Sequence, residues 1–463
     1  MRLSSLLNTE FPEVQGNVIV GEDQIRMNRI IQACGNVVLL VTSVMVGTVL
    51  GELGCRLAGY TTSLKAFPIT LYPQFYHKAD PVNGYDINEE FVGGPFEFAE
   101  YIHNYGAPFP VTSNNVGCRD RTFERDDGYV LLIGDSHTWG YVPLEQTWGM
   151  IVEDVLGTRV LKCGVAGYGS RQERNKLETV VAKAGRPRLV IVGYCVGNDL
   201  LDDYLYPSRA VIDGHLVTKV KLEDAKLGIR KVYSDDELGV RLASLREEQT
   251  KKIVRERMPN GFMARTKDFL SEHSVLYDLL RRSEHMRPLA VRIGLADPPS
   301  PISGLEVYRS TTELPWLGQA WVEHLANLQG LKRAAASVGA NLFVVLIPNS
   351  YQVYEFLRPQ NVRLDWEYPT KKLGQFFQHE GIAYLDLAPQ LKQYARRDGR
   401  PLLDAQQDLY WQYDGHMNVK GNLLTGLLIA QQVLQLPFLE LQDKGRRVLD
   451  VEQRLSTLRV VAQ

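Results

Sequence analysis

The segment Tyr129–Gly140 constrains the fold of this chain more than any other stretch. A short run of β-forming apolar residues stops at Gly134 and is followed at once by Asp135 and Ser136. Such a run is typical of a strand buried on both faces of a parallel sheet. Ligands bind at the carboxyl ends of strands in open α/β sheets, which is where Ser136 is expected. The alternative is a helix cap ahead of the helix predicted at 145–156, because Ser and Asp are both good N-caps.

Strand and helix patterns alternate from this segment to near the end of the chain. Alternation of this kind predicts a parallel sheet with helices on both faces. The predicted strands are 129–133, 159–162, 189–195, 341–347 and 382–387, and the predicted helices are 145–156, 171–183, 319–338, 366–379 and 422–434. The expected fold class is therefore α/β, a three-layer α/β/α sandwich of the flavodoxin-like kind with about five parallel strands.

Three later blocks also place glycines and polar residues beside a predicted strand or helix. Leu161–Ser170 (LKCGVAGYGS) follows the second strand, Leu189–Asp199 (LVIVGYCVGND) contains the third, and Tyr413–Gly421 (YDGHMNVKG) precedes the last helix. With the first block, in this order, they resemble the SGNH (GDSL-type) hydrolase superfamily. Upstream, Ser113–Asp120 (SNNVGCRD) resembles the lead-in of its membrane-anchored bacterial members. The resemblance covers roughly residues 110–435.

The resemblance implies specific roles for residues in the four blocks. It makes Ser136 the nucleophile, and it forms an oxyanion hole from the backbone N–H groups of Ser136 and Gly167 and the side-chain amide of Asn198. A glycine lets the backbone approach a substrate closely, and Gly164 is the competing candidate in the same block. Asn198 has the alternative interpretation of a turn residue after a strand.

The base is expected to be His416. A serine hydroxyl is a weak nucleophile until a base accepts its proton, and histidine has a suitable pKa near neutral pH. Of the nine histidines, only His416 follows a glycine, has a carboxylate two residues before it and precedes a predicted helix. The common family pattern has Asp three residues before the histidine, where Tyr413 stands here, so Asp414 is the predicted orienting carboxylate. His137 lies beside Ser136 in sequence and is expected to point elsewhere.

Other chemistries are not favoured by the sequence. Gly197-Asn198-Asp199 lacks the histidine of metallophosphatase blocks, the glycines at 164–169 have the wrong order for a dinucleotide loop, and Gly-x-Ser-x-Gly does not occur. We therefore expect no metal and no cofactor. The charge is balanced, with 52 basic and 54 acidic residues, so no nucleic acid partner is expected. Five cysteines without a Cys-x-x-Cys pair argue against a zinc site or a disulfide framework, and Cys163 and Cys195 are predicted to be buried free thiols.

Residues 30–51 form the one run long enough to cross a membrane. Val37–Leu50 contains no charged residue, and about 20 residues of helix span the ~30 Å hydrocarbon core. The alternative is a buried helix. The run begins too late for a typical cleaved signal peptide, so we expect an uncleaved signal anchor. The resemblance implies a single-pass protein of the cell inner membrane with a periplasmic catalytic domain.

The remaining segments complete the expected domain organisation. Residues 60–115 are rich in aromatic residues, which are expected to pack onto the domain, the alternative being a platform for sugar rings. Residues 200–315 are charged and partly helical and are expected to cover the ligand edge of the sheet. The expected segments are a tail at 1–29, the anchor at 30–51, the lead-in at 60–115, the SGNH domain at 116–438 with its insertion at 200–315, and a tail at 439–463.

The predicted function follows from the resemblance and the residue chemistry together. We expect a serine esterase that cleaves small acyl esters through an acyl-serine intermediate, with O-acetyl groups of a cell-envelope glycan as the expected substrate. An O-acyltransferase with the same residues is one alternative. A non-catalytic envelope or assembly protein that retains the fold is the other.

Overall fold

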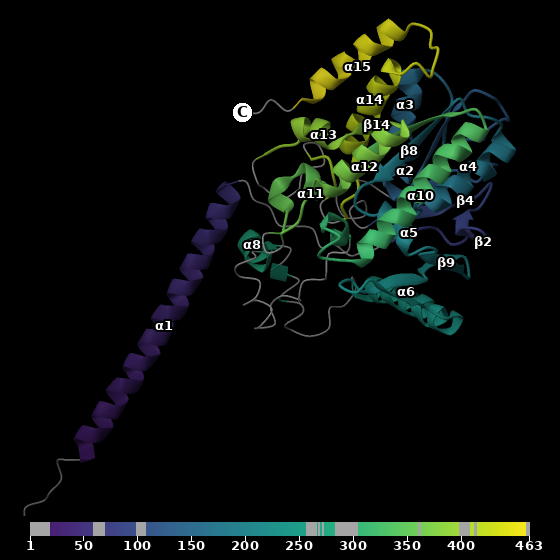
Figure 1. The fold of residues 1–463 in the computed structure, drawn as a ribbon. Helices are drawn as coiled ribbons and strands as arrows, with labels where there is room; N and C mark the ends of the chain where they lie inside the picture. The colour runs from purple at the N-terminus through teal and green to yellow at the C-terminus, as the bar shows by residue number, and fades with distance from the viewer. Residues whose placement is uncertain are drawn as a thin grey trace, which may run out of the picture. The chain divides into compact units, whose positions relative to one another are not determined.

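The computed structural model describes residues 19–58, 70–98, 108–255, 266, 269–270, 273–282, 304–359, 363–397, 408–411 and 414–459. The chain divides into two compact units. The first combines Met1–Ser63 with Met263–Asp297, and the second combines Leu64–Phe262 with Pro298–Gln463 (Figure 1).

The second unit is built on a five-stranded sheet in the order β14-β13-β8-β6-β7, and every pairing in it is parallel. This confirms the predicted fold class. Gly134 pairs with Gly193 and Cys195 with Ile347, so the neighbouring strands reach the same edge of the sheet. The strands are β6 (Val130–Gly134), β7 (Val160–Lys162), β8 (Leu189–Cys195), β13 (Asn341–Ile347) and β14 (Ala383–Asp386).

Helices cover both faces of this sheet (Figure 1). Side chains alternate along β6, so that Leu131 and Ile133 join one buried cluster and Val130 and Leu132 join the other. The first cluster is shared with α4 (Ser170–Ala184), α10 (Trp316–Ser337) and α12 (Tyr368–Glu380). The second is shared with α3 (Trp148–Leu156), α14 (Val419–Gln435) and α15 (Lys444–Leu458).

Helix α15 lies in the segment expected as a C-terminal tail. It is amphipathic, and it buries Val451 and Leu455 in the cluster that α3 and α14 share. The Arg447 guanidinium also donates a hydrogen bond of 2.8 Å to the carbonyl of Val155. The helix is therefore packed onto the domain through one face.

Antiparallel strands in the lead-in segment bury its aromatic residues. Tyr76, Tyr85 and Phe96 form a cluster with Trp139 and Tyr141, which follow Ser136 in the chain. This confirms the expectation of packing; Phe67 and Tyr101 lie outside the described residues. The strands are β1 (Thr70–Leu71), β2 (His77–Asp80), β3 (Gly84–Ile87), β4 (Val92–Phe98) and β5 (Phe109–Thr112).

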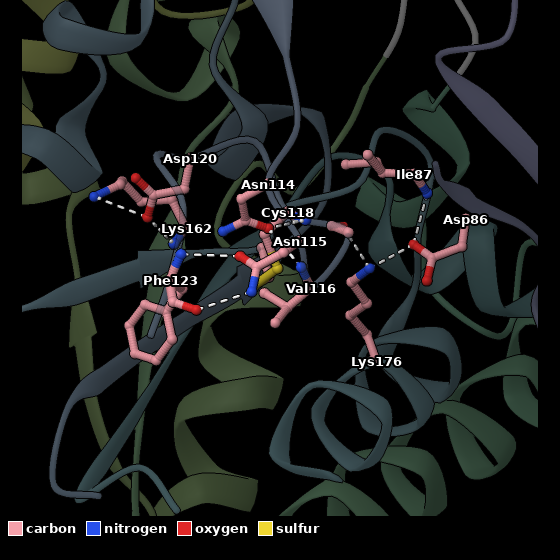
Figure 2. Close-up of a disulfide and its surroundings, with 12 residues drawn as sticks. Asp86, Ile87, Asn114, Asn115, Val116, Cys118, Asp120, Phe123, Lys162 and Lys176 are labelled. Carbon is pink, nitrogen blue, oxygen red and sulfur yellow. Dashed lines mark hydrogen bonds and ion pairs between the residues drawn. A yellow bond between two sulfur atoms is a disulfide. The ribbon is translucent and has the colours of Figure 1, made fainter. Parts of the chain in front are cut away.

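The block Ser113–Asp120 forms a turn that is tied to the sheet by a disulfide (Figure 2). The Asn114 side-chain oxygen accepts hydrogen bonds from the N–H groups of Val116 and Cys118, at 3.1 and 2.9 Å. Cys118 is bonded to Cys163, at the end of β7. The prediction of a free thiol at Cys163 is therefore wrong. The two cysteines are 45 residues apart, and only the tertiary packing of the lead-in on the sheet brings them together.

The insertion contains strands that the sequence reading missed. Hairpin β9 (Arg209–Ile212) and β10 (His215–Thr218) is closed by Asp213-Gly214, both with positive φ. Asp-Gly between two apolar runs is a strong hairpin signal, and it was available in the sequence. A second hairpin and a helix follow: β11 (Val220–Asp224), β12 (Ile229–Val232) and α6 (Asp235–Arg255).

The first unit contains α1 (Ile19–Leu57) and α8 (Val275–Arg282). Within α1, Arg29–Leu57 is long and apolar enough to cross a membrane, with a mean hydropathy of 2.0 and none of its most apolar window buried. The carboxylate of Glu52 accepts hydrogen bonds from the N–H groups of Val275 and Leu276, at 3.0 and 2.9 Å. Glu52 therefore caps the first turn of α8.

Candidate active site

Ser136 lies where β6 ends and a short helix, α2 (Ser136–Trp139), begins. Asp135 is the N-cap of this helix, since its side chain accepts a 2.8 Å hydrogen bond from the N–H of His137. Gly134 has a φ of 150°, and a Cβ there would lie only 2.6 Å from the carbonyl oxygen of Gly193. The turn therefore needs glycine at 134, and it leaves Ser136 8% exposed at the edge of the sheet.

The structure brings Ser136, His416 and Asp414 into one hydrogen-bonded chain. Nε2 of His416 lies 2.7 Å from Oγ of Ser136, and Nδ1 of His416 contacts Oδ1 of Asp414. Gly415 has a φ of +83°, so the loop turns sharply enough for a carboxylate two residues before the histidine to reach its ring. The unusual spacing noted in the sequence is thus compatible with an oriented imidazole.

The loop that carries His416 is held at both ends. Asn418 caps α14, with its side-chain oxygen 2.9 Å from the N–H of Gly421. The carbonyl of His416 accepts a 2.8 Å hydrogen bond from the N–H of Trp411. His416 is therefore positioned by the start of α14 behind it and by the hydrogen bond from Trp411 in front of it.

The imidazole of His416 is stacked against two rings, and sequence reasoning missed both contacts. Its centroid lies 3.9 Å from that of Tyr141 and 4.5 Å from that of His137. Burial and the neighbouring His416 lower the pKa of His137 to about 4, so this second histidine is neutral at pH 7. Burial works in the same direction on His416, but the charge and hydrogen bond of Asp414 outweigh it and raise the pKa of His416 above its ordinary value.

The side-chain amide of Asn198 lies beside the nucleophile block, at the end of β8. Its nitrogen donates to Asp135 Oδ2 at 3.0 Å and to Asp202 Oδ2 at 2.8 Å. Its oxygen is buried and has no partner among the residues that the structure describes. Burial, reinforced by the charge of Asp135, raises the pKa of the Asp202 carboxyl to about 7.

The two candidate glycines in the second block have different surroundings. A Cβ at Gly164 would meet the backbone of α2, with the nitrogen of Trp139 at 2.5 Å, so Gly164 is needed for packing. Gly167 has a φ of +77°, and its Cα faces the hydroxyl of Tyr85 and the guanidinium of Arg209. Val165 places this loop next to the end of β6, because its N–H donates to the carbonyl of Gly134 at 2.9 Å.

Arg119, from the lead-in block, fixes the loop that follows Ser136. Its guanidinium donates to the carbonyl groups of Trp139, Gly140 and Val142 at 2.7, 2.6 and 2.7 Å, and it lies 3.9 Å above the Trp139 ring. It is only 3% exposed. The arginine of the lead-in block therefore has a structural role: it hydrogen-bonds three carbonyl groups of a loop that belongs to no strand.

One group of possible metal ligands occurs among the described residues. Ligand atoms of Asp135, His137 and Cys195 lie within 4.8 Å of one another. Both oxygens of Asp135 already accept hydrogen bonds, and burial raises the pKa of the Cys195 thiol well above its usual range. A protonated thiol is a poor ligand, so the donor set fits a hydrogen-bonded support for Ser136 better than a metal centre.

No family model and no curated protein matches this chain. Among solved structures, one from Desulfitobacterium hafniense, named as a lipolytic protein of the G-D-S-L family, is 13% identical with a TM-score of 0.30. It covers 66% of this chain and 99% of its own. Another from Bacteroides fragilis, named as an acylhydrolase, is 10% identical with a TM-score of 0.27 and covers 73% of this chain and 91% of its own. Both names are provisional assignments. The chain resembles the SGNH hydrolases in its four blocks and in the α/β sheet whose edge brings those blocks together.

Proposed function

We propose that this protein is a serine esterase that cleaves small acyl esters through an acyl-serine intermediate. The observation that carries the proposal is the chain of contacts from Ser136 Oγ through both nitrogens of His416 to Asp414. A nucleophile, a base within 2.7 Å of it and a carboxylate that orients the base are the parts that acyl transfer needs.

In the first half-reaction, Oγ of Ser136 attacks the ester carbonyl while Nε2 of His416 accepts the hydroxyl proton. Charge develops on the carbonyl oxygen, where the N–H groups of Ser136 and Gly167 and the amide of Asn198 are the proposed donors. The C–O bond to the alcohol then breaks, and His416 returns the proton to the leaving oxygen. Water repeats the sequence on the acyl-serine and releases the carboxylic acid and free Ser136.

Small O-acetyl esters of a cell-envelope glycan are the proposed substrate. A membrane-length helix and the resemblance to membrane-anchored bacterial members support an envelope location. Transfer of the acyl group to a sugar hydroxyl would use the same residues, with the alcohol replacing water in the second step. Incubation with an acetyl ester and a glycan acceptor separates the two activities, because hydrolysis yields acetate and transfer yields an acetylated sugar. A non-catalytic protein would yield neither product.

Replacing Asn198 with alanine should lower kcat by roughly 10²–10³ with little change in KM. The amide would donate to the oxyanion only in the transition state, by releasing Asp135 or Asp202. Steady-state kinetics on 4-nitrophenyl acetate measure the effect, and Asn198→Asp, which removes the donor and adds a charge, should be at least as damaging. A folded Asn198→Ala protein within threefold of the wild type would limit this amide to supporting Asp135.

The proposed topology is a single-pass inner-membrane protein with its catalytic domain on the periplasmic side. The disulfide supports this side, because disulfides persist in oxidising compartments and are rare in the cytosol. In intact cells, Cys118 and Cys163 should therefore be oxidised, and the protein should resist carbonate extraction from membranes.

Alkylation of acid-quenched, denatured protein with a polyethylene-glycol maleimide measures this. Of five cysteines, the three outside the disulfide should react, and all five should react after reduction. A Cys118→Ser/Cys163→Ser variant is the control, since reduction should not change its three adducts. Five adducts on the unreduced wild type would place the domain on the cytosolic side.

A further inference from the structure

Arg209, the first residue of β9, reaches from the insertion to the proposed oxyanion hole. A Cβ at Gly167 would lie 3.1 Å from its Nε and 3.4 Å from its Cζ, so the guanidinium lies directly against this glycine. Position 167 has a φ of +77° and little room for a Cβ, and glycine is the residue type that both conditions favour. An insertion that begins just after Asn198 thus places a cation at the active-site edge.

The groups that face this cation are mostly neutral hydroxyls. Tyr72, Tyr85 and Tyr141 lie close enough to influence its pKa electrostatically, as does the Asp202 carboxyl, whose own pKa burial raises to about 7. The tyrosine hydroxyls are engaged elsewhere: that of Tyr85 donates to the carbonyl of Ala166 at 2.7 Å, and those of Tyr72 and Tyr141 share a 3.2 Å hydrogen bond. Within the part of the chain that the structure describes, Arg209 forms no hydrogen bond or ion pair through its guanidinium.

Arg209 is half-buried at the edge of the site, so its guanidinium is open to solvent or to a ligand. Removing a charge from water is costly unless an opposite charge and hydrogen bonds replace the solvent. Arg119, the buried arginine of the site, donates to three carbonyl oxygens, whereas the half-buried Arg209 has its five N–H donors available to water or to a ligand. A guanidinium matches the two oxygens of a carboxylate or a phosphate in a planar, bidentate fashion.

We propose that Arg209 binds an anionic group, a carboxylate or a phosphate, carried by the ester substrate next to the scissile carbonyl. The proposal rests on the proposed esterase function, because Ser136 and Gly167 define where that carbonyl lies. Arg209 would then determine specificity and would favour acidic over neutral esters. The competing role, a further donor to the oxyanion itself, predicts equal losses on acidic and neutral esters.

Kinetics on neutral and anionic phenyl esters test this on the full-length protein in detergent, with the change between Arg209 variants as the readout because the esters also differ in intrinsic reactivity. Phenyl acetate is the neutral reference, 4-acetoxybenzoate and 4-acetoxyphenyl phosphate place the anion in the alcohol, and monophenyl glutarate places it in the acyl group. In the wild type, kcat/KM for at least one anionic ester should exceed that for phenyl acetate by roughly 10- to 100-fold. Arg209→Gln should abolish this preference. Arg209→Lys keeps the positive charge but lacks the planar, bidentate guanidinium, so it should retain part of the preference. Arg446→Gln removes an exposed arginine of α15 and should leave the preference intact.

A binding measurement separates this inference from the esterase proposal. In a Ser136→Ala background, calorimetry should give a lower Kd for the preferred anionic ester than for phenyl acetate, and Arg209→Gln should raise that Kd about tenfold or more. Arg209-dependent binding without any turnover in the wild type would reject the esterase function and keep the anion site. Turnover without an Arg209-dependent preference, or equal losses on all four esters, would reject the anion site and keep the esterase.

Discussion

Replacing Ser136 with alanine should abolish ester hydrolysis and labelling by a fluorophosphonate probe, with a loss in kcat of roughly 10⁴–10⁶. The oxygen that His416 contacts at 2.7 Å is the only atom removed, and no base can activate a methyl group. The fold should survive, because Asp135 rather than Ser136 caps α2 and Oγ lies at the edge of the site. Turnover of 4-nitrophenyl acetate and mass spectrometry of the labelled peptide measure both effects.

Ser170→Ala is the matched control. Ser170 is a fully buried serine at the start of α4, and its hydroxyl has no partner among the described residues. It should keep both activity and labelling if the probe reacts at the proposed nucleophile. Labelling that persists in Ser136→Ala and disappears in Ser170→Ala would move the nucleophile to the second block.

The sheet could be predicted from the sequence because its strands are continuous apolar runs with abrupt ends. Strands β8 and β13 have the predicted bounds, since Gly197 comes two residues after the first run and Pro348 directly follows the second. The predicted helix at 145–156 begins later, at Trp148, because Leu144–Gln146 forms a 3₁₀ turn instead. Local pattern is sufficient where the core alone determines the structure.

The insertion and the disulfide show where local pattern is not sufficient. The β9–β10 hairpin has mostly intermediate burial and only short apolar runs, so Asp213-Gly214 is the one clear local signal of it. The Cys118–Cys163 pair depends on the lead-in folding back over β7, which no spacing along the chain reveals.

The site itself was only partly predictable. The relation of His416 to Ser136 followed from the order of blocks, and Asp414 from its place near a glycine. The stacking of His137 and Tyr141 on His416 follows from the short helix α2, which turns the chain so that residues one and five positions after Ser136 face the same loop. A strand-to-helix turn of this kind sets side-chain directions that a linear motif does not encode.

Replacing His416 with alanine should lower kcat about as far as Ser136→Ala does, by roughly 10⁴ or more, whereas His137→Ala should cost far less. The two histidines differ in their contacts. His416 has one nitrogen on Ser136 and the other on Asp414, while Nδ1 of His137 is buried without a partner among the described residues. His137 thus supports the base by stacking and offers no proton path. Steady-state kinetics on 4-nitrophenyl acetate, with circular dichroism to verify folding, measure both variants.

The pH dependence tests the same assignment through a second observable. The base must be neutral to accept the serine proton, so activity should be lost as the pH falls through the pKa of His416. Because Asp414 raises that pKa above the ordinary histidine value, the acidic limb of the kcat/KM profile should lie above pH 6.5. Asp414→Asn should shift the limb to lower pH and reduce the plateau, since the imidazolium loses its counter-charge. A limb near pH 4, the value expected for His137, or equal losses in folded His137→Ala and His416→Ala proteins, would make His137 the base instead.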